Sequence, residues 1–157
     1  MHGRLELMEK AIALAMANVS SGRGGPFGAV IVHGEQIIAE ASNLVASTND
    51  PTAHAEIVAI RAACKVLNTF ELSGCVIYTS CEPCPMCLAA ICWAHMDGIF
   101  YGSTAEDAAS AGFDDARLYE EIKLPVELRK IPAVNLLRER AAAVFAAWQL
   151  HEGRIDY

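Results

Sequence analysis

The feature that most constrains the fold is a short β-rich run that leads into a segment rich in proline and cysteine. The run Val76–Thr79 favours a strand, and Pro85 then suits the first position of a helix predicted over residues 85–95. Cys84 and Cys87 are three residues apart at the start of that helix, so both sulfur atoms are expected to face the same way. The sequence therefore predicts a strand-to-helix junction that presents two thiols side by side.

Helical and strand-like patterns alternate along the rest of the chain, with short connectors and no repeat. Helices are expected over residues 4–20, 50–67, 85–95, 104–109 and 137–151, and strands over residues 27–32, 36–41, 76–79, 98–101 and 133–136. This alternation predicts one α/β domain over residues 1–157, a three-layer α/β/α sandwich with a mixed central sheet. Functional sites are expected where strands run into helices.

Two of these helices are predicted from particular signals. Apolar side chains recur at the spacing of an amphipathic helix in the first of them: Leu5, Met8, Ile12, Ala15, Met16 and Val19. The second is expected to begin at Asp50–Pro51. An aspartate can cap a helix, and the N–H that proline lacks would be unpaired in the first turn anyway.

The composition excludes several classes of protein. With 54% hydrophobic residues among 157, the chain has enough apolar surface to fold, and no apolar run reaches the roughly 18 residues of a transmembrane helix. The formal charge is -7, and residues 97–121 hold seven acidic residues and one basic residue, Arg117. This acidity indicates a solvated face and argues against nucleic-acid binding. No secretion signal opens the sequence, so the cytoplasm is the expected compartment.

A histidine near the start of another predicted helix supplies a third candidate ligand. His54 lies in the segment Thr52–Glu56. One imidazole and two thiolates leave a zinc ion with an open fourth position, which is the arrangement of catalytic sites. The N-terminus of a helix also favours the thiolate form of cysteine.

Cys81 extends the cysteine spacing to C-x-x-C-x-x-C and could close the site as a fourth ligand. The spacing alone therefore leaves a structural and a catalytic zinc site equally open. Without an export signal, metal binding is expected in preference to disulfides. The remaining cysteines lie in apolar runs and are expected to be small buried hydrophobes: Cys64, Cys75 and Cys92.

Glu56 favours the catalytic alternative. Two residues after His54, its carboxylate can stand beside the metal without binding it. There it can take a proton from water, whose pKa zinc lowers from about 15.7 toward about 7. The competing interpretation is an acidic residue that merely favours the start of a helix.

The combination H-x-E with P-C-x-x-C is a signature of zinc nucleobase deaminases. The chain resembles the cytidine-deaminase-like superfamily over nearly its whole length, and within it the guanine deaminases of bacteria. The resemblance is carried by residues 24–30, 49–56, 78–87 and 111–115, and by the terminal Tyr157. It implies the α/β/α fold, one Zn²⁺ per chain and hydrolytic deamination of guanine to xanthine and ammonia.

The resemblance also implies a role for individual residues. His54, Cys84 and Cys87 would hold the zinc, Glu56 would shuttle protons, and Cys81 would be a neighbouring free thiol. Six residues would contact the purine or close its pocket: Phe27, Asn43, Ala55, Trp93, Asp115 and Tyr157. Taken without the resemblance, the aromatic residues at 27 and 93 suit a core, Asn43 suits a turn, and the terminal Tyr157 suits a frayed end.

Other functions stay open at this point. A tRNA-specific adenosine deaminase shares both motifs but would need a basic groove, and this chain offers only scattered basic residues near its C-terminus: Arg129, Lys130, Arg138 and Arg140. A deaminase of another small aminoheterocycle, or a non-catalytic zinc-binding module closed by Cys81, are further alternatives. The resemblance implies a homodimer, with residues 137–157 exchanged between subunits, and neither nucleic acid nor membrane is an expected partner.

Overall fold

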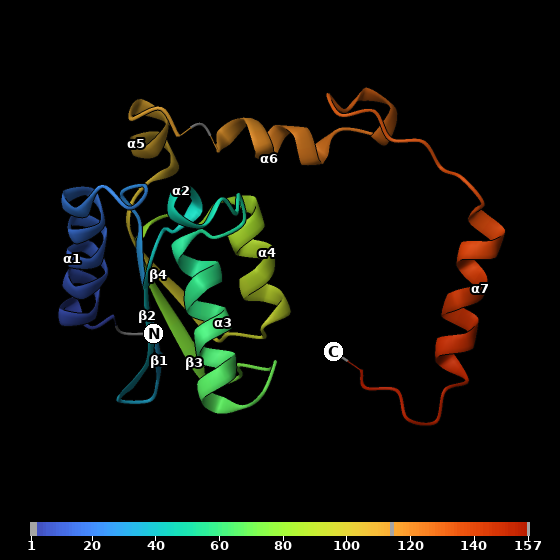
Figure 1. Cartoon of the computed structure of the whole chain (residues 1–157), viewed down its shortest axis with the longest axis horizontal. Coiled ribbons are helices and arrows are strands. Elements are labelled where there is room, and N and C mark those ends of the chain that lie inside the picture. The colour runs from blue at the N-terminus through green and yellow to red at the C-terminus, as the bar shows by residue number, and fades with distance from the viewer. Residues whose placement is uncertain (1–2, 114, 157) are drawn as a thin grey trace. The chain divides into compact units, whose positions relative to one another are not determined.

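The computed structural model describes residues 3–113 and 115–156, and four strands among them form one sheet in the order β2-β1-β3-β4 (Figure 1). The strands are β1 (Gly28–His33), β2 (Gln36–Ser42), β3 (Cys75–Cys81) and β4 (Gly98–Ser103). β1 pairs antiparallel with both β2 and β3, whereas β3 and β4 run parallel. The sheet is therefore mixed, and these four strands lie where the sequence predicts them.

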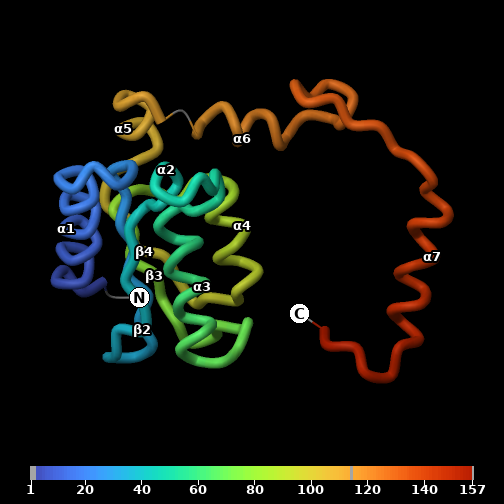
Figure 2. The backbone as a smooth tube through the Cα atoms, viewed as in Figure 1, coloured from blue at the N-terminus to red at the C-terminus, as the bar shows by residue number. Residues whose placement is uncertain are grey.

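Helices cover both faces of the sheet. The helices within residues 3–113 are α1 (Leu5–Ser21), α2 (Val45–Thr48), α3 (Ala55–Leu67), α4 (Pro85–Trp93) and α5 (Ala105–Ser110). α1 lies on one face, and α3 and α4 lie on the other (Figures 1 and 2). Side chains of β1 alternate between the two cores: Ala29 and Ile31 pack on the α3 side, and Val30 and Val32 pack on the α1 side. The predicted three-layer α/β/α sandwich is confirmed.

The buried face of α1 differs from the predicted apolar stripe. Leu7, Ala11, Ala15 and Asn18 are buried, whereas most of the apolar residues that predict the helix are exposed: Leu5, Ile12, Met16 and Val19. A Cβ added at Gly28 of β1 would overlap the carbonyl oxygen of Ala11 and lie 2.8 Å from the backbone nitrogen of Ala15. Helix and strand backbones approach so closely that small residues fill this face.

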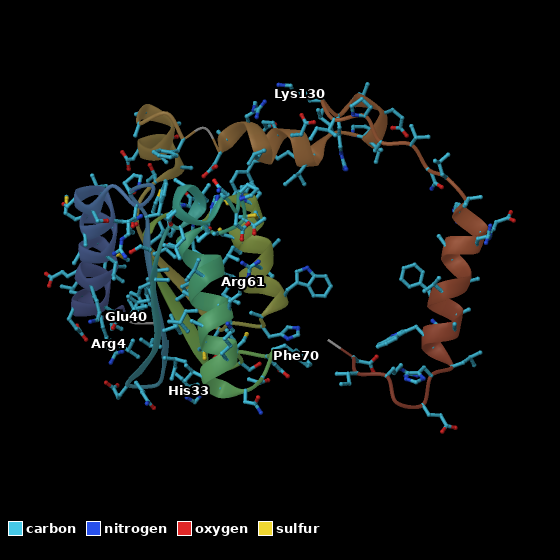
Figure 3. The ribbon with its side chains drawn as sticks, viewed as in Figure 1. Arg4, His33, Glu40, Arg61, Phe70 and Lys130 are labelled. Carbon is cyan, nitrogen blue, oxygen red and sulfur yellow. The ribbon has the colours of Figure 1, made fainter. Side chains whose placement is uncertain are left out.

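Asp50 begins a turn and not the predicted helix. Its Oδ1 accepts hydrogen bonds from the backbone N–H of Thr52 at 2.8 Å and from the Thr52 hydroxyl at 2.7 Å. Arg61 of α3, which is labelled in Figure 3, donates to Oδ2 at 3.4 Å. These bonds fix an Asx turn. α3 starts later, at Ala55 with His54 as its N-cap, so the expected start at Asp50–Pro51 is wrong.

The chain divides into two compact units, Met1–Leu118 and Tyr119–Tyr157. The second unit contains a short 3-10 helix, η1 (Val126–Leu128), and α7 (Arg138–Gln149); α6 (Ala116–Lys123) spans the boundary. α7 confirms the predicted C-terminal helix. Residues 133–136 form no strand in the described part of this unit, so that prediction is wrong. None of the helices in the described ranges has the length and apolar character needed to cross a membrane.

Candidate active site

Both predicted ligand segments lie at helix starts. β3 ends at Cys81, and α4 begins at Pro85 with Cys84 as its N-cap. Proline suits this first helical position because its φ angle matches the helix and its missing N–H costs nothing there. His54 holds the equivalent place before α3. The backbone of a helix end therefore fixes the direction of each ligand side chain.

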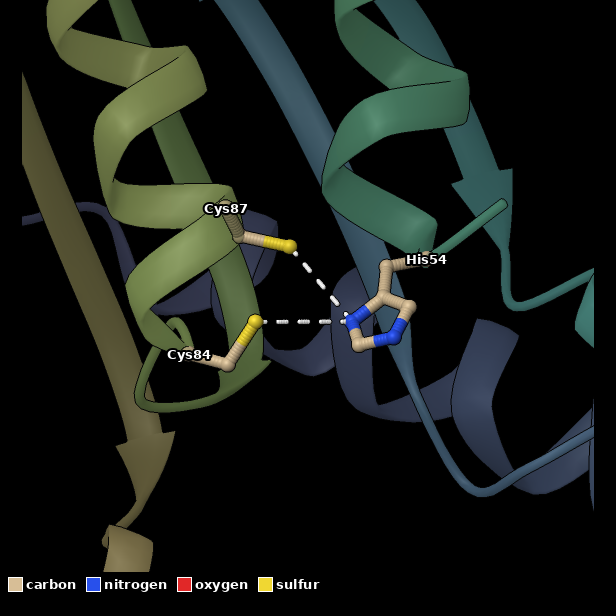
Figure 4. A group of neighbouring side chains, drawn as sticks. All are labelled: His54, Cys84 and Cys87. Carbon is tan, nitrogen blue, oxygen red and sulfur yellow. Dashed lines mark hydrogen bonds between the residues drawn. The ribbon is translucent and has the colours of Figure 1, made fainter. Parts of the chain in front are cut away.

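The imidazole and the two thiols converge on one point. His54 Nδ1 lies 3.6 Å from Cys84 Sγ and 3.5 Å from Cys87 Sγ (Figure 4). The ligand atoms of all three residues lie within 4.8 Å of one another. Zinc binds imidazole nitrogen at about 2.0–2.1 Å and thiolate sulfur at about 2.3 Å, so tetrahedral geometry separates such a pair by about 3.6 Å. The donor set and its spacing fit a zinc ion.

Hydrogen bonding gives the thiols of Cys84 and Cys87 different pKa values. The bond with Cys87 lowers the pKa of Cys84 to about 4, and the same bond, together with burial, raises the pKa of Cys87. The hydrogen bond to Cys84 raises the pKa of His54. A cation held by the three residues would favour the deprotonated form of each. The cluster therefore has the chemistry of a metal site.

Cys81 lies apart from this cluster. Its buried thiol donates to the carbonyl oxygen of Thr104 at 3.6 Å, and burial raises its pKa. Among the described residues, the group with metal-binding geometry at this site consists of His54, Cys84 and Cys87. This arrangement favours the open, catalytic type of site over the closed, structural type.

Glu56 lies in the first turn of α3 and is only 6% exposed. Burial raises the pKa of its carboxyl group. Glu56 lines the same cavity as His54 and Cys84, yet it is not part of the ligand cluster. A buried carboxyl group with a raised pKa beside such a cluster is suited to accept and return protons.

A cavity of about 310 Å³ opens beside the cluster, which is the size range of small-molecule sites. Its described lining residues are Gly25, Phe27, Asn43, Val45, Ala46, Pro51, His54, Glu56, Glu82, Cys84, Phe113 and Asp115. Three of these carry carboxyl groups and none is lysine or arginine. Such a lining suits a small ring with N–H donors and disfavours a phosphate group.

Only some of the predicted substrate-binding residues lie in the described lining of the cavity. Three of them line the cavity: Phe27, Asn43 and Asp115. Ala55 is fully buried at the first position of α3, where helix N–H groups have no intrahelical partner. Trp93 ends α4 with 66% of its surface exposed and is not brought to the described lining. Tyr157 lies outside the described residues.

Sequence reasoning missed six residues of the described lining: Gly25, Val45, Ala46, Pro51, Glu82 and Phe113. The Phe113 ring meets the Phe27 ring edge-to-face, with centroids 4.9 Å apart and an interplanar angle of 84°. Glu82 accepts a hydrogen bond from the backbone N–H of Ala105 at 3.1 Å. Glu82 is adjacent to Cys81 and close to Cys84, so its place in the motif was the one available signal. Phe113 had a signal in its position within residues 111–115, one of the segments that carry the resemblance.

Comparison with known proteins defines the class. A profile of the cytidine and deoxycytidylate deaminase zinc-binding region matches residues 1–103. The chain belongs to this family of zinc-binding deaminases.

Individual relatives narrow the class further. The guanine deaminase of Bacillus subtilis (strain 168) is 50% identical over 150 residues, which cover 96% of each chain. An X-ray structure of guanine deaminase from Bacillus subtilis matches with a TM-score of 0.95 and 48% identity, covering 99% of both chains. The tRNA-specific adenosine deaminase of Aquifex aeolicus (strain VF5) is 44% identical over 78 residues, 50% of this chain and 52% of the relative. The likeness to guanine deaminase is full-length, and the likeness to this tRNA deaminase covers half of the chain.

Proposed function

We propose that the chain catalyses the hydrolytic deamination of guanine to xanthine and ammonia. The observation that carries this proposal is its 50% identity with a guanine deaminase over 96% of both chains. The cavity adds physical support, because its described lining offers carboxyl groups and no lysine or arginine. Guanine is a neutral ring with several N–H donors and no phosphate, and it matches such a lining.

In this proposal His54, Cys84 and Cys87 hold one Zn²⁺ per chain. The ion would supply a Lewis acid that makes water nucleophilic near neutral pH. The spacing of the three ligand atoms supports this role. The stoichiometry follows from one such cluster among the described residues of the chain.

Glu56 is proposed as the proton carrier. Its carboxylate takes a proton from the attacking water and passes it to a ring nitrogen of guanine, while the water oxygen bonds to C2. The carboxylate then takes the second proton from the new hydroxyl group at C2 and delivers it to the exocyclic amine, the bond between C2 and that amine breaks, and ammonia leaves. The carboxylate is regenerated, so one residue serves both transfers, each worth about 10²–10⁴-fold in rate. The burial of Glu56 beside His54 supports this assignment.

The cavity walls are proposed to recognise the ring. Asn43 would hydrogen-bond the purine edge, Phe27 would pack on its face, and Asp115 would accept from its N–H groups. The backbone N–H of Ala55 would contact the ring. The positions of Phe27, Asn43 and Asp115 in the lining support this assignment. For Trp93 and Tyr157, contact with the purine stays a prediction from the resemblance.

We further propose that the chain forms a homodimer in the cytoplasm, with residues 137–157 exchanged between subunits. α7 exposes three large apolar side chains, Val144, Phe145 and Trp148. Exposed apolar side chains grouped on one helix favour association with another surface. Sedimentation equilibrium of the full chain tests this: a stable monomer at micromolar concentration would contradict it.

A substrate panel tests the proposed function. Ammonia release is measured with zinc-loaded protein on guanine, adenine, cytosine, cytidine, an aminotriazine and a tRNA anticodon stem-loop. We expect guanine to be the best substrate by kcat/KM. Faster turnover of the stem-loop would establish the tRNA deaminase alternative, and faster turnover of another free ring would establish a different aminoheterocycle. Full zinc content without turnover of any compound would indicate a non-catalytic zinc-binding module.

A further inference from the structure

Asn18 interrupts the apolar, buried face of α1. It is 2% exposed and shares that face with Leu7, Ala11 and Ala15. Asparagine is a poor helix former, and a buried amide costs free energy unless it is hydrogen-bonded. A residue that departs from both rules is expected to serve a purpose beyond packing the helix.

The Asn18 amide joins two separate walls of the cavity. Its Nδ2 donates to the carbonyl oxygen of Gly25 and to the carbonyl oxygen of Asn43, both at 2.8 Å. Because both partners accept hydrogen bonds, the orientation of the amide is fixed. Gly25 precedes β1, Asn43 follows β2, and both residues line the cavity. A single side chain from α1 therefore links two loops that are far apart in the sequence.

The same hydrogen-bond chain continues into the residues proposed to hold the substrate. The N–H of Phe27 donates to the Gly25 carbonyl at 2.8 Å, and the N–H of Asn43 donates to the Phe27 carbonyl at 3.0 Å. We call the place where Asn18, residues 25–27 and Asn43 meet the junction, and the adjacent Gly24 leaves room for it. A Cβ there would overlap the Asn43 carbonyl oxygen and lie 3.0 Å from Asn18 Nδ2. Asn18 therefore supports the place where residues 25–27 and Asn43 meet, beside the direct backbone hydrogen bond between Phe27 and Asn43.

We propose that Asn18 is a positioning residue for substrate binding, which holds the Gly25 and Asn43 walls at the separation that a planar ring ligand requires. The inference deepens the proposed function and rests on it. Asn18 is absent from both the metal-ligand cluster and the cavity lining, so it acts through its neighbours. Its loss should weaken substrate binding and leave the proton transfers of Glu56 intact.

The kinetic test uses two changes that disturb the junction in opposite ways. Asn18→Leu removes both donors while keeping the number and branching of the side-chain heavy atoms, and Gly24→Ala keeps the donors but forces the walls apart. For each variant we expect KM for guanine to rise by about 10- to 100-fold, where the 100-fold limit is the order of the cost of a 1 Å misplacement. The change in kcat should be less than about 2-fold. Zinc content and the pH dependence of kcat should match the wild type.

Leu7→Ala is the matched control, because Leu7 lies on the same buried face of α1 and does not line the cavity. It should lower thermal stability while KM stays at the wild-type value. A rise in KM with Leu7→Ala equal to that with Asn18→Leu would overturn the positioning role. A wild-type KM with Asn18→Leu would overturn it as well.

Amide hydrogen exchange supplies a readout that needs no turnover. With Asn18→Leu, the N–H groups of Phe27 and Asn43 should exchange faster, whereas those in the centre of β3 should keep their protection. Unchanged exchange at both residues would contradict the proposal. If the wild-type chain deaminates no compound of the panel, the proposed function fails, and exchange alone decides the role of Asn18. If Asn18→Leu does not fold, Gly24→Ala decides by the same two measurements.

Discussion

The metal-ligand cluster and the cavity walls adjoin each other but are built in different ways. His54 and Cys84 are N-caps, and Cys87 follows within the first turn of α4, so helix ends fix all three ligands. The walls come from loops distant in sequence, and long-range hydrogen bonds such as those of Asn18 join them. A short segment can therefore specify a ligand, whereas only the tertiary structure can specify a wall.

This difference predicts two kinds of defect. Changes in the ligand cluster should alter metal content and folding together, because metal binding is coupled to folding. Changes in the walls should alter kinetics while metal content and stability persist. A variant at a residue between the cluster and the walls then shows, by which of these defects it has, to which of the two the residue belongs.

The largest effect is expected from Cys84→Ala. Removing this thiolate should abolish zinc binding and all measurable deamination. Tm should fall by several degrees, since each 1 kcal/mol lost lowers Tm by about 2–4 °C in a domain of this size. Metal analysis and thermal unfolding measure these effects. Cys92 of the same helix is exposed, so the expectation that it is buried is wrong. Cys92→Ala is therefore the control and should keep zinc and Tm. Full zinc occupancy in Cys84→Ala would remove it from the cluster.

Glu56→Gln should abolish most of the chemistry and leave the metal in place. The substitution keeps the size of the side chain but replaces the carboxylate with an amide, which cannot carry protons. We expect kcat to fall by about 10²–10⁴-fold. Zinc content and Tm should match the wild type. A variant that retains more than about a tenth of the wild-type kcat would show that Glu56 is not the proton carrier.

The metal cluster could be predicted from sequence because its geometry is local. The spacing of Cys84 and Cys87 and the proline between them fix a helix start, and the structure brings His54 to them. The strands β1 to β4 were predictable for the same reason, since alternation and turn residues act over a few positions. The start of α3 was not, because Asp50 bonds to Thr52 and Arg61 and forms a turn.

Contacts between segments distant in the sequence explain the features that the sequence did not predict. The buried face of α1 uses alanines and Asn18 because Gly28 lets the strand approach the helix closely. A pattern of large apolar residues therefore indicated the wrong face. Phe113 reaches the cavity by packing on Phe27, a contact that no local pattern encodes. The residues 133–136 have the composition of a strand, but pairing also requires a partner, and β propensity depends on that context.

Asp115→Asn tests a wall directly. If the carboxylate accepts from guanine N–H groups, the amide replaces one acceptor with a donor, and recognition suffers. We expect kcat/KM for guanine to fall by about 10²-fold, as when positioning slips by 1 Å. Zinc content and Tm should not change. Glu106→Gln, at an exposed position of α5, should match the wild type in all three measurements. Loss of zinc in Asp115→Asn would place this residue functionally with the metal cluster.

Deleting residues 155–157 tests whether the C-terminus closes the cavity. The deletion removes an aromatic ring and a carboxylate but nothing from the metal cluster. If Tyr157 contacts the purine, kcat/KM for guanine should fall by about 10- to 100-fold while zinc content persists. Steady-state ammonia release beside metal analysis decides this. Wild-type kinetics would remove Tyr157 from the proposed pocket and leave the deaminase assignment standing.

The smallest effect is expected from Cys81→Ser, which lies where the two regions meet. Cys81 ends β3 only three residues before Cys84, but its thiol donates to the Thr104 carbonyl and is not part of the ligand cluster. A serine hydroxyl can donate to the same carbonyl, so one zinc per chain and kcat within about 2-fold of the wild type are expected. Metal loss as large as that of Cys84→Ala would instead make Cys81 a fourth ligand. The site would then be closed and structural, and a catalytic role for this centre would no longer hold.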